Sequence, residues 1–185
     1  MSERSVKEKI CIKNFVVTGR PGSGKTTIVM RVAEEMRNRG FIIRGILTPE
    51  IRVKGSRTGF AVRAIDTGEE RIFASIRFRG YPRVGKYGVR VDIFESVALP
   101  ALDRALEGDI ILIDEIGKME LLSETFVKAV YRALDSPKIV LATMGKGLGH
   151  PIETTIKRRR DTRVFFVNKG LESRIINMIV KYLIS

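Results

Sequence analysis

The sequence has one cysteine, one histidine, four asparagines, and no tryptophan or glutamine. The single cysteine, Cys11, excludes a disulfide within the chain, and its place before the first expected strand predicts a small core residue. The single histidine, His150, argues against a histidine-based metal centre because it has no neighbouring cluster of ligands. Few amide side chains and 30% charged residues are typical of a heat-adapted protein.

Long apolar runs are also missing. No apolar stretch reaches the roughly 18 residues that a membrane span needs. Residues Met1 to Lys13 lack the apolar core of a signal peptide, so we expect a cytoplasmic protein with no membrane partner. A length of 185 residues with 44% hydrophobic content predicts a single domain over residues 1–185. The oligomeric state stays open, with a monomer slightly favoured.

Basic residues outnumber acidic ones by 34 to 21, which gives a net charge of +13. Such a charge attracts polyanions, and both nucleotides and nucleic acids fit that description. The excess gathers in residues 52–90 and again in residues 157–163. A solvated basic face explains the first cluster equally well.

Apolar runs that read as strands alternate with amphipathic segments that read as helices. This alternation predicts an α/β fold, with a mostly parallel sheet flanked by helices and ligands at the carboxyl ends of its strands. An antiparallel hairpin is expected over Gly59 to Phe78, where apolar residues recur at every second position. The expected strands are Asn14–Thr18, Phe41–Leu47, Asp109–Ile113, Lys138–Thr143 and Arg163–Val167, and the main helices are Lys25–Arg39, Asp92–Leu106, a helix capped by Ser123, Pro151–Arg160 and a last one from Leu171.

The helix over Asp92 to Leu106 carries two further expectations. Asp92 and Glu95 have the spacing of a capping box at its start. Pro100 should kink the helix or restart it.

A glycine-rich motif follows the first strand. Residues 19–26 match G-x-x-x-x-G-K-[ST] at every fixed position, which chance produces in about one chain in a hundred of this length. Glycines let the backbone amides surround phosphate oxygens, and the following helix presents its positive dipole to the same anion. We expect Lys25 to reach the β- and γ-phosphates and to act in catalysis, and Thr26 to ligate Mg²⁺. The predicted phosphate-binding residues are Gly19, Arg20, Pro21, Gly22, Ser23, Gly24, Lys25, Thr26 and Thr27.

Two carboxylates, Asp114 and Glu115, follow the apolar strand that ends at Ile113. Phosphoryl transfer needs an acidic group for Mg²⁺ and a group that orients the attacking oxygen. We assign Asp114 to the metal and nucleotide, and Glu115 to catalysis as general base or as the group that positions the attacking water. Asp114 and Gly117 also match the D-x-x-G pattern of switch-type GTPases, but Asn168 to Leu171 lacks the acid that reads guanine.

Two weaker candidates lie further along the chain. Thr143, at the end of a strand, either senses the γ-phosphate or serves as an ordinary turn residue. The run Arg158, Arg159 and Arg160 is a candidate source of an arginine that neutralises charge during phosphoryl transfer.

These motifs resemble a family of small nucleoside-triphosphatases first described from thermophiles, which includes the cancer-related nucleoside-triphosphatase. The resemblance rests on the phosphate motif with Thr27, on Gly45–Glu50 with Arg52, on Arg57–Phe60, on Lys86–Val89, on Phe94–Pro100 and on Asp114–Glu120. It implies a RecA-like P-loop fold with an extra strand between the P-loop strand and the acidic strand. It also implies slow, Mg²⁺-dependent hydrolysis of several nucleoside triphosphates with loose base preference, and places Gly117 and Lys118 near the nucleotide. The glycine-rich stretch Thr143 to His150 departs from the family pattern, so no base-contacting residue is assigned there.

Three functions remain after the sequence is considered alone. A nucleoside-triphosphate phosphohydrolase fits best, because Glu115 can orient water. A kinase for a nucleotide or small molecule is the closest enzymatic alternative, since arginine-rich lids are common in kinases. A nucleic-acid-associated ATPase is the third, suggested by the basic cluster in residues 52–90.

Overall fold

The structure, a computed structural model, describes residues 11–184. Helices and strands alternate through most of this range, as the sequence pattern predicts. In chain order they are β1 (Asn14–Gly19), α1 (Lys25–Asn38), β2 (Ile43–Leu47), β3 (Glu50–Val53), β4 (Ser56–Ala64), β5 (Glu70–Ser75), β6 (Arg83–Val84), β7 (Tyr87–Val89), α2 (Val91–Ala105), β8 (Ile110–Ile116), the 3-10 helix η1 (Glu120–Leu122), α3 (Glu124–Asp135), β9 (Ile139–Gly145), α4 (Pro151–Arg158), β10 (Thr162–Phe166) and α5 (Glu172–Ile184).

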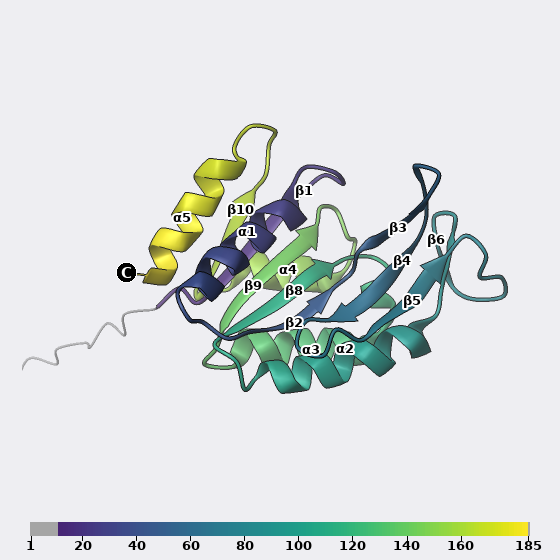
Figure 1. The fold of residues 1–185 in the computed structure, drawn as a ribbon, viewed down its shortest axis with the longest axis horizontal. Helices are drawn as coiled ribbons and strands as arrows, with labels where there is room; N and C mark the ends of the chain where they lie inside the picture. Colours follow the sequence, from purple (N-terminus) through teal and green to yellow (C-terminus); the bar gives the residue numbers. More distant parts are fainter. Residues whose placement is uncertain (1–10, 185) are drawn as a thin grey trace, which may run out of the picture.

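Within residues 11–184, ten strands form one mixed sheet in the order β10-β1-β9-β8-β2-β4-β5-β7-β6, with β3 paired to β4. The strands from β10 to β2 are all parallel. Strand β9 lies between β1 and β8, which confirms the extra strand that the resemblance implies. The carboxyl ends of β1, β8 and β9 therefore meet at one edge, the upper one in Figure 1.

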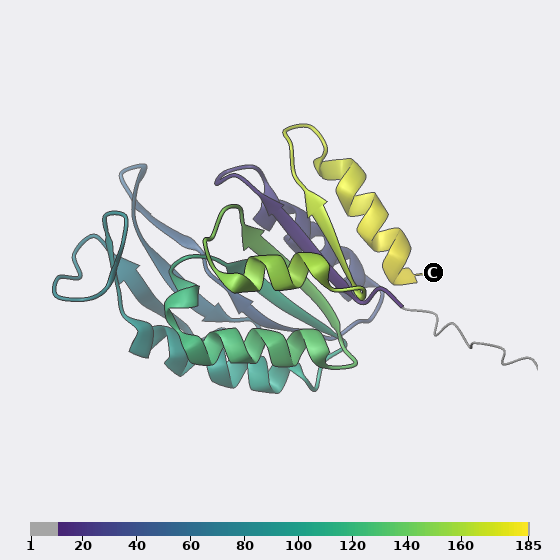
Figure 2. The same cartoon turned by 180° about the vertical axis from the view of Figure 1, so that it is seen from behind.

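Both faces of the parallel half are covered by helices, because successive side chains of each central strand point to opposite faces. Phe15 and Val17 of β1 pack with α1 and α5, whereas Val16 packs on the other side with α2, α3 and α4. Figures 1 and 2 show these two helical layers from opposite sides. The fold is thus an α/β sandwich, as predicted. No helix in the described range is long and apolar enough to cross a membrane.

The sheet continues beyond β2 as an antiparallel extension, in which β4 pairs with β2 and β5 pairs with β4. The predicted hairpin is confirmed as β4 and β5, but the expected alternation of faces is not maintained. Phe73 and Ala74 are adjacent and both fully buried, whereas Ile72 and Ile76 are 48% and 40% exposed. A register shift in the β4–β5 ladder accounts for the change, because an extra residue turns the following side chains to the other face.

Helix α2 begins and continues differently from the prediction. Arg90 is its N-cap, and no side chain caps it, so the capping box of Asp92 and Glu95 is wrong. Asp92 instead pairs with Arg90, and Glu95 accepts a hydrogen bond from Ser123. Pro100 does not restart the helix, which continues to Ala105, because Pro100 lies on the exposed side, where water can satisfy the freed carbonyl group.

Two further expectations differ in detail. Cys11 is exposed instead of buried, because β1 begins only at Asn14 and Cys11 itself lies outside the sheet. Helix α4 ends at Arg158 instead of Arg160.

Candidate active site

The glycine-rich motif forms the turn between β1 and α1. Gly22 and Gly24 have φ angles of 74° and 93°, a backbone conformation that side chains with a Cβ rarely adopt. The turn delivers the amino end of a 14-residue helix, which begins at Lys25, to the carboxyl edge of the sheet. The Ser23 hydroxyl is buried, and within residues 11–184 it has no hydrogen-bond partner. A bound phosphate oxygen would satisfy such a group, so the turn fits an anion.

Lys25 is the cation of this turn. Its side chain is only 6% exposed, and its Nζ donates hydrogen bonds to the carbonyl oxygens of Gly19 and Arg20 at 3.4 and 3.3 Å. The same Nζ lies 3.9 Å from Oε1 of Glu115. The carbonyl contacts are long, which leaves the ammonium group available to a phosphate.

Asp114 lies at the carboxyl end of β8, where two threonines hold it. Thr26 Oγ1 donates to Asp114 Oδ1 at 3.0 Å, and Thr143 Oγ1 donates to the same oxygen at 2.6 Å. Burial raises the pKa of Asp114, and the two hydroxyl groups and Lys25 oppose that rise. A carboxylate and a threonine hydroxyl are ligands that Mg²⁺ accepts, so Asp114 and Thr26 fit this metal.

Glu115 is the next residue, and its side chain is one-third exposed. Burial raises its pKa, Lys25 lowers it, and the charge of Asp114 raises it further. A raised pKa improves a carboxylate as a general base near neutral pH. The structure therefore brings the predicted acidic pair together with the predicted lysine.

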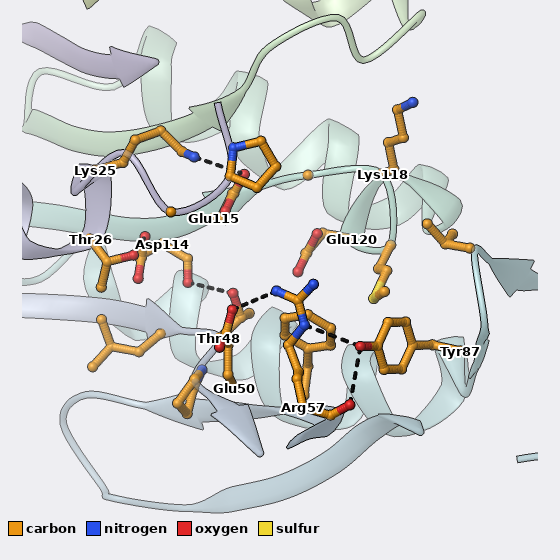
Figure 3. Close-up of a pocket in the computed structure, with 18 of the residues that line it drawn as sticks. Lys25, Thr26, Thr48, Glu50, Arg57, Tyr87, Asp114, Glu115, Lys118 and Glu120 are labelled. Atoms are coloured by element: carbon orange, nitrogen blue, oxygen red, sulfur yellow. Dashed lines mark hydrogen bonds and ion pairs between the residues drawn. The ribbon is translucent and has the colours of Figure 1, made fainter. Parts of the chain in front are cut away.

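The cavity at this edge has a volume of about 790 Å³ and reaches well beyond the glycine-rich turn. Its proximal half is lined by Pro21, Gly22, Gly24, Lys25, Thr26, Thr27, Asp114 and Glu115. The other half, which we call the distal half, is lined by Thr48, Glu50, Arg57, Phe60, Tyr87 and Glu120. Figure 3 shows both halves facing the same space.

The polar groups of the distal half are joined by hydrogen bonds. Arg57 donates through Nη1 to Glu50 Oε1 at 2.6 Å and through Nε to the Tyr87 hydroxyl at 3.1 Å. Thr48 donates to the backbone carbonyl of Asp114 at 2.9 Å, which ties this half to the acidic strand. Sequence reasoning misses these residues, although Glu50, Arg57 and Tyr87 lie in motifs that carry the family resemblance.

Glu120 is a buried carboxyl group, 6% exposed, that points toward the space between Glu115 and Arg57 (Figure 3). Burial raises its pKa to about 8, and the nearby charges of Glu115 and Asp114 act in the same direction. Glu120 is thus held as the neutral acid over most of the physiological range. The motif Asp114–Glu120 contains it, but no sequence signal distinguishes it from a surface glutamate.

Glu120 should make stability depend on pH. The native protein keeps a proton that the unfolded chain releases above its ordinary pKa of 4.5, so stability is full below that value and falls as pH rises toward 8. We expect the wild type to lose ~3–4 kcal/mol relative to Glu120→Gln between pH 5 and 8, since one pKa unit corresponds to 1.36 kcal/mol. Urea unfolding of both proteins at pH 5, 6.5 and 8 measures the difference, and parallel pH dependences would contradict the assignment.

Three sets of predicted residues remain: Gly117 with Lys118, Thr143, and the run Arg158 to Arg160. Gly117 and Lys118 line the cavity, although the ammonium group of Lys118 points away from Asp114 and Glu115 in Figure 3. Thr143 is fully buried and positions Asp114.

The run Arg158 to Arg160 is not brought to the cavity. Arg159 pairs with Asp161 and Asp135, next to the start of β10. The first residue of β10 pairs with Asn14, the first residue of β1. The glycine-rich turn follows the opposite end of β1, and the length of the strand separates the two ends by ~16 Å. The structure therefore does not bring this run to the cavity of its own chain, and its role as a source of a catalytic arginine stays a prediction.

Comparison with known proteins agrees with the geometry. A family model described as NTPase matches residues 14–180. The nucleoside-triphosphatase THEP1 of Korarchaeum cryptofilum is 45% identical over 166 residues, which cover 89% of this chain and 84% of that protein. This chain belongs to the THEP1 nucleoside-triphosphatase family. It is a P-loop enzyme of the hydrolase class with nucleoside triphosphates as substrates.

Other members of the THEP1 family extend the agreement to the fold. The protein of Methanothermobacter thermautotrophicus is 43% identical over 91% of this chain and 95% of its own length. The crystal structure of THEP1 from the hyperthermophile Aquifex aeolicus matches with a TM-score of 0.81 at 34% identity, covering 92% of this chain and 98% of that one. The solution structure of a human cancer-related nucleoside triphosphatase matches with a TM-score of 0.78 at 34% identity, over 92% and 97% of the two chains.

Proposed function

We propose that this enzyme hydrolyses the γ-phosphate of ATP, GTP and other nucleoside triphosphates to give the diphosphate and phosphate, with Mg²⁺ as cofactor and little base preference. The observation that carries the proposal is the convergence of Lys25, Asp114 and Glu115 on one cavity. The contact between Lys25 and Glu115 marks the position of the γ-phosphate, because Lys25 is the residue that reaches the terminal phosphates.

Each side chain then has a defined task. The amides of residues 20–25 and the dipole of α1 bind the phosphate oxygens. Lys25 moves from the carbonyl groups of Gly19 and Arg20 to the β- and γ-phosphates. Glu115 accepts the proton of a water molecule, whose oxygen then bonds to the γ-phosphorus while the bond to the bridging oxygen breaks.

Thr26 and Asp114 are the residues that would hold Mg²⁺. The metal supplies charge neutralisation at the phosphate oxygens. Thr143 keeps Asp114 in place from the neighbouring strand β9 and leaves its second oxygen, Oδ2, free of these two hydroxyl groups.

Removal of the metal is expected to abolish activity. With excess EDTA, phosphate release should fall at least ~100-fold, because the charge of the transferred group is no longer neutralised. Added Mg²⁺ should restore it. Phosphate release that persists in EDTA at the original rate would contradict the cofactor assignment.

Loose base preference is supported by the stretch Asn168 to Leu171, which lacks the acid that reads guanine. Phosphate release from ATP, GTP, CTP and UTP, measured with no other acceptor present, tests the whole assignment. Rates within about tenfold of one another are expected. The absence of phosphate release from all four nucleoside triphosphates would overturn the hydrolase assignment.

A further inference from the structure

The distal half of the cavity is larger than hydrolysis requires. Water is the second substrate of a hydrolase and needs only a position beside Glu115. The cavity nevertheless extends from Glu115 to Arg57 and Tyr87, on strands β4 and β7 of the antiparallel extension. In Figure 3 these groups lie on the far side of Glu115 from Lys25. Because Lys25 is the residue that reaches the terminal phosphates, the groups lie beyond the γ end of the triphosphate.

This half is built from side chains that are already held in position. Glu50, Arg57 and Tyr87 are joined by hydrogen bonds, and Phe60 packs edge-on against the Tyr87 ring with 5.3 Å between ring centroids. The Arg57 guanidinium group lies 5.3 Å from the Phe60 ring centroid. Pre-positioned polar groups beside an aromatic surface are the usual composition of a small-molecule site.

We propose that the distal half is an acceptor site, which binds an uncharged nucleoside and presents its hydroxyl group to the γ-phosphate. This inference rests on the proposed function, because it uses the same bound triphosphate and the same base. The enzyme would then transfer the phosphoryl group to the nucleoside, and hydrolysis is the same reaction with water in place of the hydroxyl group.

The chemistry of the lining selects this class of acceptor. A flat base can stack on Phe60 and on the guanidinium plane of Arg57. Ribose hydroxyl groups can donate to the carboxylate of Glu50. A second phosphate group gains no free cation from this network, since the guanidinium groups of Arg57 and Arg52 are both already paired with Glu50. The site therefore fits a nucleoside better than a nucleotide.

The transfer step balances without any further reactant. The nucleoside oxygen forms a bond to the γ-phosphorus, and its proton passes to the Glu115 carboxylate. The bond between the γ-phosphorus and the bridging oxygen breaks, and its electron pair leaves with the nucleoside diphosphate. The products are the diphosphate of the donor and the monophosphate of the nucleoside.

The test uses ATP labelled in its γ-phosphate with adenosine, guanosine, cytidine or uridine. Labelled nucleoside monophosphate and labelled phosphate are separated and counted for the wild type and for Phe60→Ala and Arg57→Gln. We expect monophosphate from at least one nucleoside, in an amount that saturates with nucleoside concentration. The ratio of monophosphate to phosphate should fall at least tenfold in both variants. Tyr81→Ala, a change of an exposed aromatic residue outside the cavity lining, should keep the wild-type ratio.

The possible results separate this inference from the function on which it rests. Labelled phosphate without monophosphate from any of the four nucleosides overturns the acceptor site and leaves the hydrolase intact. Absence of both products overturns the hydrolase as well. A monophosphate yield with an unchanged ratio in both variants places the acceptor elsewhere and overturns the assignment to the distal half. Circular dichroism of the same variant samples shows whether they are folded, and Arg57→Gln, which keeps a polar side chain, carries the test should Phe60→Ala fail to fold.

Discussion

Replacement of Lys25 by alanine is expected to lower kcat/KM for phosphate release at least ~1000-fold, because the β- and γ-phosphates lose their only buried ammonium partner among the described cavity residues. The change should also weaken binding of a non-hydrolysable ATP analogue, since a charge-assisted hydrogen bond contributes to the ground state. Steady-state phosphate release and titration calorimetry measure the two effects.

The matched control for Lys25 is Lys128→Ala. Lys128 is an exposed lysine of α3, on the helical face below the sheet and outside the site. Its replacement should leave kcat/KM unchanged. A Lys25→Ala enzyme that is folded by circular dichroism and keeps more than a tenth of the wild-type activity would contradict the assignment of the phosphate site.

Replacement of Glu115 by glutamine is expected to lower kcat by ~100- to 10,000-fold while nucleotide affinity stays within a few-fold of wild type. The amide keeps the shape of the side chain but cannot accept the proton of the attacking water. Glutamine also removes the negative charge that faces Lys25 and would repel the γ-phosphate, so affinity for the triphosphate should rise slightly. Single-turnover phosphate release and analogue binding measure the two quantities separately.

Glu124→Gln provides the comparison for Glu115, because Glu124 is an exposed carboxylate at the start of α3. Its kcat should equal that of the wild type. An unchanged kcat in Glu115→Gln would remove the general base from the mechanism, and the carboxyl group of Glu120 would become the next residue to replace.

The proximal half of the site could be predicted from the sequence because its residues are contiguous. The turn at residues 19–26 is recognised by its own motif. The strand before Asp114 is recognised by the consecutive apolar residues 110–113. Parallel strands bring their carboxyl ends to the same edge, so the two motifs had to meet. The contact between Thr143 and Asp114 follows from the same rule, once β9 is placed beside β8.

The distal half could not be predicted in the same way. Glu50, Arg57 and Tyr87 come from three different strands, and only the register of the antiparallel extension brings them together. The register shift that buries Phe73 beside Ala74 has no marker in the sequence. The position of Arg159 could not be predicted for a related reason, since two aspartates distant from the glycine-rich turn pair with it. Binding of nucleic acid by the basic cluster in residues 52–90 stays a prediction.

Both ends of the cavity are built on a single hydrogen-bonded sheet, which runs without interruption from β1 to β7. Enzymes that close around two substrates commonly do so by rotating one domain against another at a hinge. A continuous ladder of backbone hydrogen bonds allows no such rotation here. Access and exclusion of bulk water are therefore left to local segments, such as the end of β6 and the turn to β7, where Val84 and Gly85 line the cavity.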